Sequence, residues 1–116
     1  MGTPWLPEIP GDPAGMRSLA GTLRGHAARA AAIGESVGST LAALVFEGPA
    51  AGPFRERQRD AASAFRTSAE ELQALAGLLE SSATEVEAAQ RERERRLAEM
   101  WAEYRAQHEM LPGRAI

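Results

Sequence analysis

The chain has 116 residues, no cysteine and a formal net charge of −3, and its 13 basic residues are all arginine. The lack of cysteine excludes disulfide frameworks, thiolate metal sites and cysteine nucleophiles, and a pI of about 5.4 argues against a nucleic-acid-binding face. Leu, Ile, Val and Phe supply only 20 residues, whereas alanine alone supplies 24. An Ala-, Leu-, Glu- and Arg-rich chain with so low a net charge predicts one domain of long helices rather than disorder.

Residues 1–12 are expected to form an extended, proline-rich arm. Proline stands at positions 4, 7 and 10 and again at 13, and each proline fixes φ, lacks an N–H donor and pushes the preceding residue towards an extended conformation. Trp5, Leu6 and Ile9 make the arm unusually apolar, so it is either a ragged terminus or a strip that docks on a helix. It has neither the basic nor the apolar region of a cleaved secretory signal.

The first helix is expected over about residues 13–45. Asp12 followed by Pro13 is a typical start, because the carboxylate caps free N–H groups and proline fits the first turn. Large apolar residues then recur at intervals of three, four and seven, as in a helix that packs lengthwise on another. They are Leu19, Leu23, Ile33, Val37 and Leu44, and His26 falls on the same stripe. Five glycines within the segment each cost up to about 1 kcal/mol relative to alanine, so tertiary contacts must hold this helix.

The segment 46–53 breaks this pattern, because Gly48-Pro49 stops a helix and a proline suits the start of the next one. A second helix is expected over about 54–110, with a tail at 112–116. Its apolar stripe consists of Phe54, Phe65, Leu72, Leu75, Leu79 and Val86. Two long amphipathic helices with a short connection must lie antiparallel. The sequence therefore predicts an all-α fold over residues 13–111, a two-helix hairpin whose second helix extends beyond the first.

The far end of the second helix carries a charge run and then a new apolar stripe. The run at 91–96 predicts a solvated face with Glu87–Arg91 and Glu92–Arg96 as i,i+4 pairs. The stripe that follows is a candidate recognition patch, made of Leu97, Trp101 and Tyr104. Because the arm emerges at this end of an antiparallel hairpin, we expect its apolar residues to pack near this patch.

A two-helix hairpin so rich in alanine cannot complete a core alone, because each helix has only one neighbour. Pairing two hairpins into a four-helix bundle would cover the remaining apolar surface. We therefore expect a homodimer, or a heterodimer with a related helical hairpin.

The turn between the helices resembles that of a known family. Phe46-Glu47-Gly48, with the residues that follow up to Phe54, is similar to the W-x-G-x-A-A-x-x-F turn of the WXG superfamily, the early-secreted-antigen-like hairpin proteins of type VII secretion. The two apolar stripes match the family's helices, so the resemblance covers roughly residues 13–90. It implies pairing with a related hairpin, an interaction with a secretion-machinery ATPase, and an export role for Phe46, Glu47 and Gly48.

The chain departs from the family's pattern at two places. Phe46 replaces the motif tryptophan, which keeps an aromatic side chain but loses the indole N–H donor. The family's Y-x-x-x-D/E export signal is absent, because Tyr104 is followed four residues later by His108, and Glu109 arrives one residue late. If the signal is needed, a partner chain supplies it; otherwise this chain is an unexported relative.

The sequence predicts neither an enzyme nor a cofactor or metal site. His26 and His108 have no His or Asp at i+3 or i+4, and no Glu-x-x-His pair of the di-iron type occurs. The nucleophile elbow, the P-loop and the dinucleotide fingerprint are also missing.

The leading hypothesis is a type VII secretion substrate or substrate partner, secreted without a signal peptide or cytoplasmic before export. A cytosolic coiled-coil adaptor or scaffold is an alternative, for which the helical periodicity alone is enough. The chain could also be the N-terminal targeting module of a larger toxin, with Pro112-Gly113 in the linker. Membrane contact is not favoured, because the hydrophobicity is modest and no stretch approaches the roughly 18 apolar residues of a span.

Overall fold

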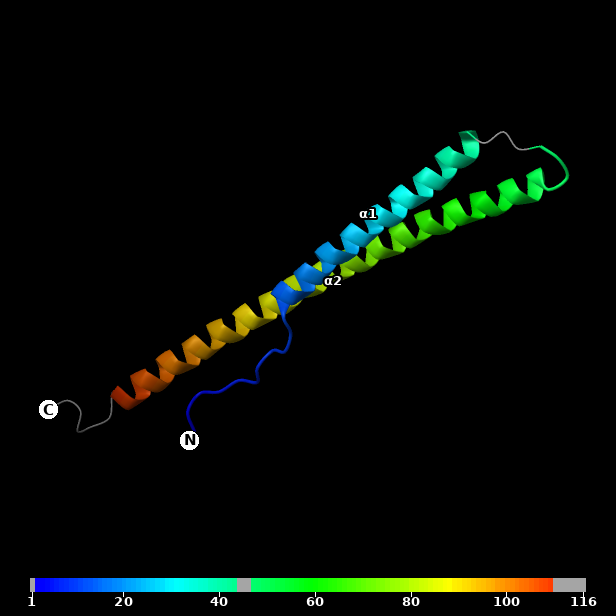
Figure 1. Cartoon of the computed structure of the whole chain (residues 1–116). Helices are drawn as coiled ribbons and strands as arrows, with labels where there is room; N and C mark the ends of the chain where they lie inside the picture. Colours follow the sequence, from blue (N-terminus) through cyan, green and yellow to red (C-terminus); the bar gives the residue numbers. More distant parts are fainter. Residues whose placement is uncertain (1, 44–46, 110–116) are drawn as a thin grey trace. The chain divides into compact units, whose positions relative to one another are not determined.

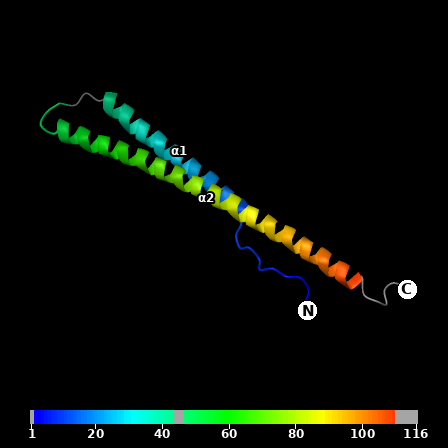
Figure 2. The ribbon, with the colours of Figure 1, turned by 180° about the vertical axis from the view of Figure 1, so that it is seen from behind.

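The fold is an all-α helical hairpin, as the sequence predicts. The computed structural model describes residues 2–43 and 47–109, and over these ranges it contains two helices, α1 (Pro13–Ala43) and α2 (Ala51–Glu109), and no strand. Figures 1 and 2 show α1 running antiparallel beside the first half of α2. Leu44, Phe46 and the tail at 112–116 lie outside the described residues. Neither helix, within these limits, contains a stretch apolar enough to cross a membrane.

The chain divides into two compact units, and α2 contributes to both. One unit, Ala14–Ser81, holds nearly all of α1 and the first half of α2. The other combines the arm, up to Pro13, with the part of α2 that starts at Ser82. Each unit therefore has its own contacts, which are described separately below.

Small residues make the contact between α1 and α2 in the first unit. The buried positions of α1 are Ala20, Ala27 and Gly34, and those of α2 in this unit are Ala62, Ala69 and Ala76. In each helix these positions are seven residues apart, which keeps them on one line facing the partner helix. Because no side chain beyond a methyl group separates the two backbones there, the helices approach closely.

Gly34 marks the tightest place in this contact. A Cβ atom added to it would stand 3.1 Å from the carbonyl oxygen of Ala62 and 3.1 Å from the Cβ of Phe65. At Gly21, Gly25 and Gly38 an added Cβ would meet no atom within 4 Å. Only Gly34 among these four is therefore required by close helix approach; the other three weaken α1 without a packing reason in this chain.

The large apolar residues flank the line of small ones instead of forming the contact itself. Leu23 and Val37 of α1 and Phe65, Leu72 and Leu79 of α2 are half-buried. In the other unit Ala83 is buried and Val86 is half-buried. The predicted stripes therefore border the helix contact. The centre of the contact is formed by the buried alanines and Gly34.

The second helix begins at Ala51, three residues earlier than predicted. Gly48 adopts a φ of 109°, a backbone conformation that favours glycine. The Ala51 N–H donates to the Gly48 carbonyl at 3.1 Å, and the Phe54 N–H donates to the Ala50 carbonyl at 3.0 Å. Pro53 is accommodated because the first turn of a helix has no use for its missing N–H.

Two glycine substitutions test the close contact. Gly25→Ala should raise the free energy of unfolding by about 0.5–1 kcal/mol, because alanine has the higher helix propensity and the site is open. Gly34→Leu should lower it by about 1–3 kcal/mol, because the side chain forces the helices apart. Urea unfolding followed by circular dichroism measures both, and a Gly34→Leu chain as stable as the parent would contradict the close approach.

Candidate interaction surfaces

The first unit carries an apolar face, defined here by Leu19, Ile33, Phe54 and Leu75. Leu19 and Leu75 are each 50% exposed, Ile33 is 47% exposed and Phe54 is 37% exposed. Leu78, 65% exposed, lies farther round α2. Large apolar side chains that are exposed together on one side of a hairpin mark a candidate interaction surface.

The geometry of the helix contact explains why these residues share one face. Leu19, Ile33 and Leu75 each stand one residue before a buried alanine or glycine, so each is turned by about 100° from the contact. Since the helices are antiparallel and face each other, this rotation points to the same side of the hairpin on both. A groove beside Phe54, lined also by Val37 and Thr40, lies on this side.

The opposite face of the same unit is polar. Arg24 and Glu80 form a two-pronged ion pair across the helices, with Arg24 Nη2 and Glu80 Oε2 3.2 Å apart. Near the turn, a groove of about 410 Å³ has Gly38, Leu41 and Ala42 of α1 in one wall and Ala62 with three arginines of α2 in the other. They are Arg55, Arg59 and Arg66. Among the described residues, the exposed large apolar side chains other than Leu78 therefore gather on one side of this unit, and the ion pair and the three arginines lie on the other.

The turn motif lies partly outside the described residues. Glu47 and Gly48 are exposed, and Gly48 has the positive φ noted above, so two of its three residues are accessible at the end of the hairpin. Phe46, like Leu44 of the predicted stripe, lies outside the described residues.

The second unit is held by hydrogen bonds from α2 side chains to the carbonyl oxygens of the arm. Gln90 Nε2 donates to the carbonyls of Ile9 at 3.2 Å and Gly11 at 3.1 Å. Arg93 Nε donates to the carbonyls of Leu6 at 3.3 Å and Pro7 at 2.9 Å, and its Nη2 donates to Leu6 at 3.0 Å. Neither donor is predicted from the sequence. A signal for them was present in the sequence: a proline-rich segment leaves its carbonyls without internal hydrogen bonds, and a helix rich in Arg and Gln can donate to them.

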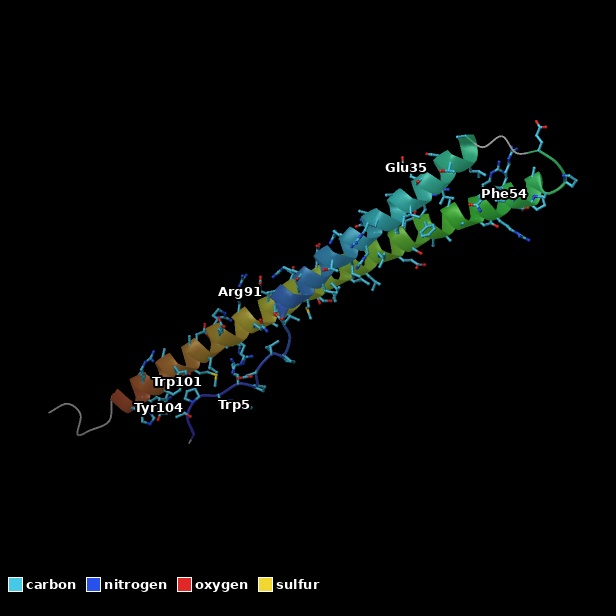
Figure 3. All side chains as sticks on the ribbon, viewed as in Figure 1. Trp5, Glu35, Phe54, Arg91, Trp101 and Tyr104 are labelled. Carbon is cyan, nitrogen blue, oxygen red and sulfur yellow. The ribbon has the colours of Figure 1, made fainter. Side chains whose placement is uncertain are left out.

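The arm docks on α2 both before the predicted patch and beside it, because Gly2 lines a pocket together with Met100, Tyr104 and His108. Leu6 and Ile9 are half-buried and line a groove with Ala89, Arg93 and Arg96, one to two turns before the expected patch. Trp5 is 69% exposed and is labelled on the arm in Figure 3. The side-chain donors at positions 90 and 93 set this register, which apolar matching alone could not predict.

The candidate recognition patch forms an aromatic row on α2. The rings of Trp101 and Tyr104 meet edge to face, with centroids 5.5 Å apart and planes at 78°, and Figure 3 labels both. His108 extends the row, because its ring lies 3.9 Å from that of Tyr104 and its Nδ1–H donates to the Tyr104 carbonyl at 2.8 Å. Leu97 is half-buried one turn earlier.

The charge run is paired differently from the prediction. Glu87 and Arg91 form the expected pair at 3.1 Å, but Glu92 pairs with Arg95 at 2.5 Å rather than with Arg96, and Arg95 also reaches Glu99 at 2.5 Å. The hydrogen bond from Arg95 lowers the pKa of the Glu92 carboxyl, and the same bond raises the pKa of Arg95. These groups are exposed, so the network keeps the helix face solvated and adds little stability.

His26 is exposed rather than part of the helix contact. Its Nδ1 accepts a hydrogen bond from Arg29 Nη2 at 3.2 Å, because the contact face is turned towards Ala27 instead. Over residues 2–43 and 47–109, no three His, Asp or Glu side chains gather as a metal site would require. In the same ranges no charged or polar side chain is fully buried.

Comparison with known proteins adds no relative: no protein-family model, curated protein or solved structure matches the chain.

A substitution at Gly11 tests the docked arm. Gly11 has a φ of 131°, and a Cβ added there would stand 2.8 Å from Val86 Cγ1. Gly11→Ala should therefore weaken the docking of the arm by more than about 1 kcal/mol and lower the ¹H–¹⁵N heteronuclear NOE of Trp5, Leu6, Glu8 and Ile9, while the helix content stays constant. Gly2→Ala, with no atom within 4 Å of its added Cβ, is the matched control; an ordered arm in Gly11→Ala would contradict this docking.

Proposed function

We propose that the chain is a non-enzymatic helical hairpin that pairs with another helical hairpin and serves as a type VII secretion substrate or substrate partner. The observation that carries the proposal is the apolar face of the first unit, with Leu19, Ile33 and Leu75 about half exposed. Such a face, on a hairpin whose other side is polar, suits lengthwise pairing into a four-helix bundle.

Energetics support pairing through this face. The contact between α1 and α2 uses mainly methyl groups, so the larger apolar side chains keep much of their surface in water. Covering the exposed part of each is worth roughly 1 kcal/mol, about half the value for a fully buried Leu or Ile side chain. Four such side chains from each of two hairpins supply a substantial part of the free energy that a stable dimer needs, before the half-buried Leu72 and Leu79 are counted.

The resemblance of the turn supports the secretion role. The segment from Phe46 to Phe54 follows the WXG pattern apart from its first residue, and Gly48 has a positive φ that other residues rarely adopt. The proposed partners are a second copy or a related hairpin, together with a secretion-machinery ATPase. Export would then proceed without a signal peptide, from a cytoplasmic dimer.

Pairing is tested by charge substitution on the apolar face. Leu75→Glu should convert a dimer of the pure chain, or a 1:1 complex formed on co-expression with a neighbouring small helical hairpin, into monomers. Multi-angle light scattering after gel filtration measures the mass. Gln73→Glu is the matched control, since Gln73 occupies the same heptad position as Glu80 on the polar face.

The outcome separates the alternatives. A parent chain that is monomeric alone and with the neighbouring hairpin would overturn the pairing proposal. If the dimer survives Leu75→Glu but is lost on a substitution in the polar face, the interface lies on the polar face instead.

Export is tested in cells that carry a type VII system. The chain should appear in the culture filtrate, and disabling the secretion ATPase should retain it in the lysate. Gly48→Val should reduce export at least several-fold while the purified variant keeps its dimer mass, because the strain is confined to the turn. Detection only in the lysate, with the secretion system intact, would favour the hypothesis of a cytosolic coiled-coil adaptor.

A further inference from the structure

The arm has a three-residue period in its sequence. Proline recurs at positions 4, 7 and 10; Pro4, Leu6 and Ile9 are half-buried, and Trp5, Pro7, Glu8 and Pro10 are exposed. Polyproline II has three residues per turn, so a segment of this kind presents every third residue to one side. Leu6 and Ile9 therefore share the side of the arm that faces α2, and Pro7 borders the same groove.

The hydrogen bonds from α2 are made to the backbone of the arm. All five hydrogen bonds from Gln90 and Arg93 end on carbonyl oxygens, those of Leu6, Pro7, Ile9 and Gly11. A polyproline helix has no internal hydrogen bonds, so its carbonyls are free to accept such donors. Gln90 and Arg93 are three residues apart on α2 and lie on one face of the helix, which lets both follow a single extended strand.

Apolar contacts complete the site without demanding a unique sequence. Leu6, Pro7 and Ile9 line a groove of about 320 Å³ together with four residues of α2, namely Ala89, Glu92, Arg93 and Arg96. Gly11 stands against Val86. The ligand requirements are thus an extended backbone, two apolar residues three apart and a glycine at the end.

We propose that the α2 surface formed by Val86, Ala89, Gln90 and Arg93, the arm site, is a recognition site for extended proline-rich segments, that the chain's own arm occupies it, and that the arm of a second copy binds there by the same contacts when the chain's own arm is displaced. Every copy carries both the site and its ligand. The prolines hold a free arm extended, so binding in trans loses little conformational entropy. Recognition of a polyproline segment by side-chain donors and an apolar groove is an established binding mode.

The inference does not depend on the proposed function. Its residues lie at 4–11 and 86–96, whereas the apolar face of the first unit is built from residues 19–75. A negative result for the arm site therefore does not affect the proposed pairing of hairpins, and the reverse also holds.

A binding experiment with the full chain tests the proposal. Leu6→Asp/Ile9→Asp weakens the chain's own arm and leaves the arm site intact, and both residues lie outside α1 and α2, so circular dichroism should show unchanged helix content. The probe is a fluorescent peptide with the sequence of residues 2–12, followed by anisotropy. The double variant should bind it saturably, and the parent chain at least about tenfold more weakly, because the tethered arm competes at an effective concentration near millimolar.

Arginine variants identify the site. Adding Arg93→Ala to the double variant should weaken peptide binding about tenfold or more, since it removes three charge-assisted hydrogen bonds. Adding Arg91→Ala is the matched control, because Arg91 pairs with Glu87 and should leave affinity within about twofold. The absence of saturable binding, equal binding by the parent and the double variant, or indifference to Arg93→Ala would each overturn the proposal.

Discussion

The close approach of α1 and α2 through methyl groups and one glycine is the constraint on which the first unit depends. Ala20, Ala27 and Gly34 face Ala62, Ala69 and Ala76 so closely that a Cβ at Gly34 would need its neighbours to move. A contact of this kind packs well but buries little apolar area per residue. Its consequence is that the leucines and isoleucines stand beside the contact, where a second hairpin can cover them. The structure thus links an alanine-rich composition to the exposure of the larger apolar side chains.

The second unit is stabilised by different chemistry. There is no partner helix for the described part of α2 beyond Ser82 within this unit; its neighbour is the arm, an extended strand whose carbonyls need donors. Gln90 and Arg93 supply them, while the exposed network around Arg95 keeps other parts of the helix in water. One helix therefore serves two purposes, helix packing in its first half and backbone recognition in its second, because its surface changes from alanine and leucine to arginine and glutamine.

Much of the fold could be read from particular residues. Asp12-Pro13 predicted the start of α1, Gly48-Pro49 predicted the turn, and the heptad spacing predicted two antiparallel helices, since these signals act over a few residues. The face of the contact was harder. Two sets of residues have heptad spacing on neighbouring sides of α1. One set is Leu19, His26 and Ile33, and the other is Ala20, Ala27 and Gly34. Hydrophobicity alone predicts that the first set forms the contact. Only the distance between the helices decides, and it favours the smaller set.

The sequence by itself determined the class of this protein: a cysteine-free, two-helix hairpin with an extended arm, a glycine turn and too few large apolar residues to finish a core. The tertiary structure decided which side of each helix is covered, that Gln90 and Arg93 hold the carbonyls of the arm, and that His26 faces solvent. The physical reason is the range of the interactions. Caps, turns and periodicity are local, whereas helix spacing and side-chain-to-carbonyl bonds join residues some 30 to 90 positions apart, and their geometry exists only once the chain has folded.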